Sequence, residues 1–120
     1  MRRVLGRKRL AIAGAVCALA SGSASSAEAA TTRSCAPVVN PYPDTKYEGV
    51  DLTEIRATKV WCSSARAVAR GAHRKALGLT PPPSGVRHFT WHRWRVTGDL
   101  RGSMDSYVAR RGTKRVRWRF

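Results

Sequence analysis

The sequence predicts an α+β fold in which one helix packs on a three-stranded antiparallel meander, with a short N-terminal strand and an extended arm. Small apolar residues recur at helical spacing between Cys62 and Gly78. Aromatic and β-branched runs, separated by turns that contain glycine, fill the last third of the chain. A proline-rich stretch precedes both regions. Three antiparallel strands whose apolar face is covered by the helix are the simplest arrangement of these elements.

Residues 1–29 have the three parts of an export signal. The basic part consists of Arg2, Arg3, Arg7, Lys8 and Arg9. The apolar run from Leu10 to Ala20 is too short to cross a hydrocarbon core of roughly 30 Å as a helix, and small residues at positions 27 and 29 fit a cleavage site. The paired arginines also suit the twin-arginine route, but their neighbours fit it less well than the general secretory route. We therefore predict a signal peptide over residues 1–29 and a mature chain that is secreted or associated with the cell envelope, without a transmembrane span.

An extended arm is predicted over residues 30–46, where three prolines block regular structure. Cys35 lies in this arm, and after removal of the leader the only other cysteine is Cys62. Two cysteines in a short exported chain predict a disulfide. A metal site or a reactive thiol pair is a poorer interpretation, because no histidine lies near either cysteine in the sequence. The bond would tie the arm to a small α+β domain over residues 47–120.

The predicted helix has one face of small residues. Its members are Cys62, Ala65, Ala69, Ala72 and Ala76, and their spacing places them on one side of the helix. Ser63 or Ser64 is the expected N-cap, and Gly78 is expected to end the helix in a left-handed conformation. Gly71 in the interior should cost up to about 1 kcal/mol relative to alanine. A short strand around residues 52–57 is predicted before the helix.

Three strands are predicted after the helix, over residues 88–96, 104–109 and 114–120. Turns with Gly98 and Gly102, and then with Gly112, separate them. The last strand has the clearest pattern, because Val116, Trp118 and Phe120 alternate with Arg115, Arg117 and Arg119. Its apolar side is expected to face the helix, and its arginines to cover the open side of the sheet.

The chain is strongly basic, with 23 Lys and Arg against 7 Asp and Glu and a formal net charge of +16. Such a charge favours anionic partners. The candidate anion-binding residues are Arg66, Arg70 and Arg74 on the helix and Arg115, Arg117 and Arg119 on the last strand. The alternative interpretation is that the arginines reflect a GC-rich genome and simply form solvated faces.

No catalytic or metal-binding motif accompanies the histidines His73, His88 and His92. We therefore predict no enzymatic activity, no cofactor and no metal. Aromatic residues interleaved with arginines over residues 87–95 and 115–120 suit a nucleic acid strand or an anionic membrane. The alternative is that Trp94 and Trp118 fill the core.

The segments Cys-Ser-Ser-Ala-Arg-Ala-Val-Ala at 62–69 and Arg-Val-Arg-Trp-Arg-Phe at 115–120 resemble those of a group of small exported, cysteine-containing proteins of unknown function, common in actinobacteria and related high-GC bacteria. The resemblance implies export and an α+β fold, and no catalytic activity. Members of the group carry a second cysteine pair, which this chain lacks. Val96 stands at one of those positions, so the resemblance implies an apolar contact in place of a disulfide, for example between Val96 and Val108.

Together these observations predict an exported, disulfide-stapled domain that binds rather than catalyses. The partner itself is not identified by the sequence. An anionic envelope polymer or anionic lipid fits the charge best, and nucleic acid fits less well. The alternative function is a secreted effector, antimicrobial or resembling a protease inhibitor, or a nucleic-acid-binding protein.

Overall fold

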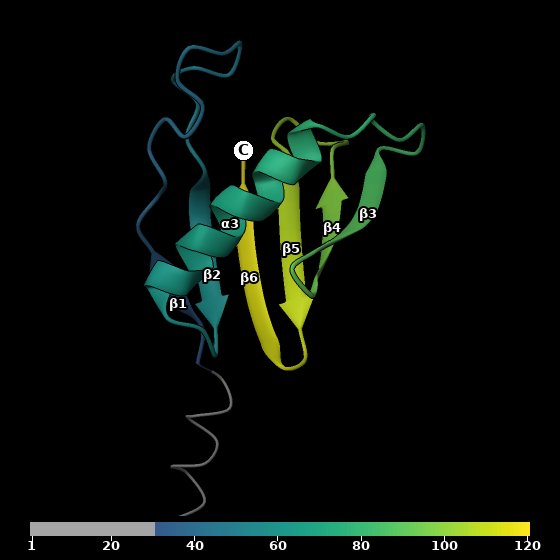
Figure 1. Ribbon diagram of the computed structural model, residues 1–120. Coiled ribbons are helices and arrows are strands. Elements are labelled where there is room, and N and C mark those ends of the chain that lie inside the picture. The colour runs from purple at the N-terminus through teal and green to yellow at the C-terminus, as the bar shows by residue number, and fades with distance from the viewer. Residues whose placement is uncertain (1–30) are drawn as a thin grey trace, which may run out of the picture. The chain divides into compact units, whose positions relative to one another are not determined.

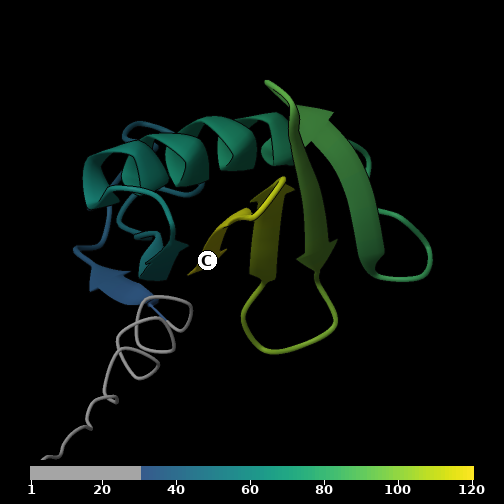
Figure 2. The ribbon, with the colours of Figure 1, turned by 90° about the horizontal axis from the view of Figure 1, so that it is seen from below.

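A computed structural model of the protein describes residues 31–120, and the predicted signal peptide lies outside these described residues. The elements in chain order are β1 (Arg33–Cys35), β2 (Thr53–Thr58), α3 (Cys62–Leu77), β3 (Val86–Trp91), β4 (Trp94–Asp99), β5 (Ser106–Arg111) and β6 (Lys114–Arg119). All six strands form one antiparallel sheet in the order β1-β2-β6-β5-β4-β3. Helix α3 crosses one face of this sheet (Figure 1) and leaves the other face uncovered (Figure 2).

The predicted three-stranded meander is wrong, first because residues 88–96 form a hairpin and not one strand. His92 and Arg93 turn the chain with φ values of 45° and 67°, and Trp91 pairs with Trp94 across the turn. A two-residue turn with positive φ at both positions matches the twist of the flanking strands. Glycine or asparagine usually marks such a turn, and neither is present here, so no residue in this segment signals the turn.

The prediction is also wrong about the N-terminal strand and the arm, which belong to the same sheet. Strand β2 pairs with β6, and β1 pairs with β2, so β6 is a central strand with a neighbour on each side. Beyond β1, the backbone groups of Val38 and Leu52 exchange two hydrogen bonds of 3.0 Å. The short strand and part of the arm thus extend a sheet that would otherwise end at β6.

The core lies between α3 and the covered face of the sheet. The small helical face is buried as predicted, with Ala65, Ala69, Ala72 and Ala76 all inaccessible or nearly so. The sheet contributes Ile55, Val96, Ala109, Val116 and Trp118, and Trp94 is buried beside them. Both tryptophans that could have faced a ligand therefore fill the core. Within residues 31–120, no helix is both long enough and apolar enough to cross a membrane.

Three local predictions need correction. Trp61, and neither Ser63 nor Ser64, is the N-cap of α3, and it makes no side-chain capping bond. Gly78 ends the helix in a right-handed conformation with φ −87°. Val96 lies opposite Ala109, while Val108 lies opposite Thr97. Residues directly opposite one another share a face of the sheet and alternate along each strand, so Val96 and Val108 point to opposite faces and cannot form the expected pair.

Gly71 has a packing role that helix propensity does not reveal. A Cβ atom at this position would overlap Cζ2 of the Trp91 ring and lie 2.6 Å from its Cη2. The hairpin of β3 and β4 therefore packs its tryptophan directly on the helix backbone. The cost of a glycine inside a helix is offset by this close contact.

We expect Gly71→Ala to destabilise the protein by about 1–3 kcal/mol, the usual cost of overpacking a core, although alanine gains up to about 1 kcal/mol of helix propensity. Chemical denaturation of the purified variant measures the change. The double variant Gly71→Ala/Trp91→Leu should lose less than the sum of the two single changes, because the smaller side chain removes the clash. A Gly71→Ala protein more stable than the wild type would contradict the role assigned to Trp91.

Candidate anion-binding face of the sheet

The open face of the sheet carries arginines on four adjacent strands. Alternation along each strand sends Val116 and Trp118 to the core and their neighbours in β6 to the open side. The same alternation in β2, β4 and β5 exposes one arginine each. Arg119, at the end of β6, also points to the open side but pairs with Glu54. We call the arginines of the open side that make no ion pair the basic face: Arg56, Arg95, Arg110, Arg115 and Arg117.

The strand register places these arginines directly opposite one another. Arg56 pairs with Arg117 between β2 and β6. Arg115 pairs with Arg110 between β6 and β5, and Arg110 pairs with Arg95 between β5 and β4. Neighbouring strands are about 4.8 Å apart, and like charges directly opposite one another destabilise a sheet. Three like-charged pairs are therefore concentrated on one surface.

Acidic side chains do not neutralise the basic face. Within residues 31–120, the ion pairs join Asp99 to Arg101 at 3.0 Å and Glu54 to Arg119 at 3.5 Å. Both are solvent-exposed, and such pairs contribute little to stability. None of the five guanidinium groups of the basic face makes an ion pair or a side-chain hydrogen bond within the described part of the chain. Apart from the buried Nε of Arg115, their hydrogen-bond donors are thus available to a ligand.

Shallow hollows lie among these arginines. One of about 330 Å³ lies along β2, β6 and β5, with Arg56, Arg117 and the paired Glu54 and Arg119 in its lining. A second of about 400 Å³ is lined by Arg95, Thr97, Arg110 and Gly112, and a third of about 360 Å³ lies between β3 and β4 and includes His88 and Arg95. The surface is a series of open, basic depressions, suited to an extended ligand rather than to an enclosed small molecule.

The structure divides the six predicted anion-binding residues between opposite sides of the molecule. Arg115, Arg117 and Arg119 are on β6, and alternation points them to the open face. Arg66, Arg70 and Arg74 are on α3, which covers the other face (Figure 2). They do not form one site with the strand arginines. Arg56 and Arg110 could not be identified from the sequence, because their proximity to the other arginines depends on which strands pair. Arg95 was predicted only as part of the run of aromatics and arginines over residues 87–95.

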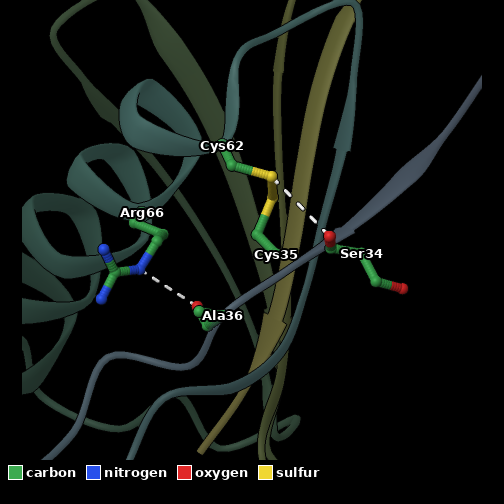
Figure 3. The surroundings of a disulfide bond; sticks show 5 residues. All are labelled: Ser34, Cys35, Ala36, Cys62 and Arg66. Carbon is green, nitrogen blue, oxygen red and sulfur yellow. Dashed lines mark hydrogen bonds between the residues drawn. A yellow bond between two sulfur atoms is a disulfide. The ribbon is translucent and has the colours of Figure 1, made fainter.

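Arg66 has a structural contact that explains its position. Its Nε donates to the carbonyl oxygen of Ala36 (Figure 3) and its Nη2 to that of Pro37, both at 3.1 Å. These bonds hold the arm against the first turns of α3. Arg70 and Arg74 remain exposed on the helix. The predicted helical ridge thus retains two solvent-facing arginines.

The predicted disulfide between Cys35 and Cys62 is present, with the two Cα atoms 5.4 Å apart. It joins the end of β1 to the first residue of α3 (Figure 3). The bond and the two hydrogen bonds of Arg66 lie close together, so they hold the same part of the arm.

His73 is a buried polar group away from the basic face. Its side chain is 0% exposed, its Nδ1 shares a hydrogen bond of 2.7 Å with the Tyr42 hydroxyl, and its ring lies 4.2 Å from that of Phe120. Burial, aided by the positive charge of Arg87, lowers the pKa of His73 to about 4. The Arg87 guanidinium is itself buried and donates to the Ala76 carbonyl at the end of α3. This cluster belongs to the core, where a solvent-borne ligand has no access.

The described residues contain no group of three or more His, Cys, Asp and Glu side chains that could hold a metal ion. His88 lies in β3, and His92 lies in the β3–β4 turn. The assumption that both belong to one strand was therefore wrong. Neither histidine shares a metal-binding cluster with the acids of residues 31–120.

Comparisons of the chain with protein-family models, with curated proteins and with solved structures found no match. The resemblance to the exported actinobacterial group therefore stays a prediction.

Proposed function

We propose that this protein is an exported, non-enzymatic binding module that holds an anionic polymer of the cell envelope on its basic face. One observation carries the proposal: Arg56 and Arg117, Arg110 and Arg115, and Arg95 and Arg110 are directly opposed on adjacent strands. Within residues 31–120, none of these guanidinium groups has an acidic partner. A bound polyanion would supply the missing negative charge.

The chemistry of arginine favours phosphate or carboxylate groups as the recognised units. A guanidinium presents a planar set of donors that matches either oxyanion in a bidentate manner. Arginines on neighbouring strands are spaced about 4.8 Å apart, and those on one strand recur every second residue, at about 6.8 Å. A chain with regularly repeated anionic groups can therefore contact several of them at once, and this favours a polymer over a single ion.

The composition of the open face argues against a single-stranded nucleic acid. Proteins that bind single strands combine basic grooves with aromatic side chains on which the bases stack. Here Trp94, Tyr107 and Trp118 are buried on the side that faces the helix. The side chains opposed on the open face are arginine, threonine, serine, valine, histidine and, at the far end of β4, Asp99. Recognition through backbone charge fits this surface better than recognition of bases.

We expect the variant Arg56→Gln/Arg117→Gln to bind polyphosphate roughly ten- to a hundred-fold more weakly than the wild type. The reason is that a charge-assisted hydrogen bond contributes about 1.5–3 kcal/mol when fully formed and less on an exposed surface. The dependence of log K on log salt should become shallower by roughly one unit for each arginine–phosphate interaction that the substitutions remove. Titration at several salt concentrations, followed by calorimetry or fluorescence, measures both quantities.

The matched control is Arg70→Gln/Arg74→Gln, which removes the same charge from the exposed helical ridge. Its affinity should stay close to that of the wild type. Equal losses of affinity in both variants would mean that only net charge matters, and the proposal would fail. Thermal melting adds a further check, because removal of the opposed Arg56 and Arg117 should leave stability unchanged or raise it by about 0.2–1 kcal/mol. If the variant binds more weakly but is as stable as the wild type, the loss of affinity comes from the altered surface and not from unfolding.

A further inference from the structure

A second basic surface lies at one end of the sheet, around the edge of the basic face. Thr58, Arg115, Arg110 and Arg95 form one row across β2, β6, β5 and β4. The next residues outward belong to the β2–α3 connection and to the β5–β6 and β3–β4 turns, which lie at the same end (Figure 1). We call this end the basic pole; its exposed charged residues are Arg33, Lys59, Arg93, Arg111 and Lys114.

The acids of the described residues lie at the opposite end. Glu54 contacts Arg119 at the end of β6. Asp99 is opposite Ser106, which is itself opposite Arg119, and the backbone of Asp105 pairs with that of Phe120. Asp51 accepts a bond from Asn40 in the arm, and the loop that holds Asp44 and Glu48 packs Tyr47 on the Phe120 ring at 5.6 Å. Charge is therefore segregated along the strand direction, and the basic pole carries no acid among the described residues.

An exposed tryptophan lies on the same pole. Trp61 is 72% exposed, and it is the only aromatic residue among the exposed large apolar side chains of residues 31–120. The Arg33 guanidinium lies 5.1 Å from the centre of its ring. Trp61 also precedes the first turn of α3, so the positive end of the helix dipole points to this pole. A large indole held in solvent among basic groups is an arrangement that suits the headgroup region of a membrane.

We propose that the basic pole docks on an anionic phospholipid bilayer, with Trp61 inserted at headgroup level and the surrounding Lys and Arg facing the lipid phosphates. The charge is complementary, because an anionic leaflet attracts nearby bases. An indole prefers the membrane interface, which a soluble polymer does not provide. The proposal does not depend on the polymer-binding function, since it concerns different residues.

The test uses the purified mature chain and vesicles of phosphatidylcholine mixed with phosphatidylglycerol. Each base near an anionic surface contributes about a five-fold factor to partitioning, so Arg111→Gln/Lys114→Gln should partition roughly 30-fold more weakly than the wild type. Vesicles whose acyl chains carry bromine should quench the wild-type tryptophan fluorescence. The Trp61→Phe variant should lose most of this quenching, because Trp94 and Trp118 are buried and the partly buried Trp91 packs its ring on Gly71 of α3.

Three results would overturn the proposal. The first is wild-type fluorescence that brominated vesicles do not quench. The second is quenching that is as strong in Trp61→Phe as in the wild type. The third is vesicle partitioning that falls as far in Arg56→Gln/Arg117→Gln as in Arg111→Gln/Lys114→Gln. Binding of soluble polyphosphate is measured with the same proteins. A chain that binds polyphosphate through Arg56 and Arg117 but ignores vesicles would retain the polymer function and refute only the docking on a membrane. Circular dichroism melting confirms that each variant is folded.

Discussion

Replacing Cys35 and Cys62 together with serine is expected to lower the free energy of unfolding by about 3–4 kcal/mol. The bond closes a segment with a sequence separation of 27 residues, and loop-closure entropy in the unfolded chain gives a stabilisation of that size. A domain of this length should then melt more than about 10 °C lower. Differential scanning calorimetry of the wild type and the serine variant measures the change.

Reduction of the wild type with a dithiol provides the control, because it breaks the same bond without changing any residue. The reduced wild type and the serine variant should melt at similar temperatures. A melting temperature that neither change lowers would mean that the bond does not restrict the unfolded chain. In that case Arg66 and the Val38–Leu52 pairing would be sufficient to hold the arm.

The effect should also spread beyond the arm, because β1 lies at the edge of the sheet. Strand β1 has three residues and, among the strands of residues 31–120, pairs only with β2. Without the disulfide, its pairing with β2 and the contacts of Arg66 would have to offset the conformational entropy of the arm by themselves. Hydrogen exchange should therefore speed up first in β1 and in the backbone bonds of Val38 and Leu52, before β5 and β6 are affected.

Patterns within one element could be predicted from the sequence. The alternation in β6 correctly separated Val116 and Trp118 from the arginines, since the period of a strand is local. The spacing of the alanines correctly predicted the buried face of α3 for the same reason. The disulfide could be predicted because only two cysteines follow the predicted leader. Each of these inferences depends on residues that are close in sequence or on a pairing without alternatives.

Features that depend on pairing between distant segments could not be predicted. The fold class was wrong because the turn at His92 and Arg93 lacks glycine, and because nothing in β2 shows that it adds to β6. The candidate site could not be predicted for the same reason, since Arg56 and Arg117 are 61 positions apart in the sequence yet directly opposed in the sheet. Gly71 is a third case, because its destabilising propensity is visible locally whereas its contact with Trp91 is not.

His73 is expected to make the protein less stable in acid. Because burial and Arg87 lower its pKa to about 4 in the folded chain, while the unfolded side chain titrates near 6.5, the unfolded state binds more protons between these two pH values. The free energy of unfolding therefore falls as the pH drops through this range. The unfolded state binds one more proton than the folded state over about two pH units. This difference lowers the free energy of unfolding by about 2–3 kcal/mol between pH 7 and pH 4.5.

Urea denaturation of the wild type and of His73→Gln at the two pH values separates this effect from that of the carboxylates. Hydrogen bonds and the charge of Arg101 lower the pKa of Asp99 to about 2, so its contribution to stability is lost mainly below pH 4. The glutamine can keep a hydrogen bond to Tyr42 but cannot titrate, so the variant should lose much less stability between pH 7 and pH 4.5, whatever its stability at pH 7. An equal loss in both proteins would show that the acids, and not His73, account for the sensitivity to acid. A loss of stability that occurs in the wild type and not in the variant would assign the acid sensitivity to the His73 imidazole, which lies between Tyr42 and Phe120. Protonation of this ring would place a second positive charge near the buried Arg87.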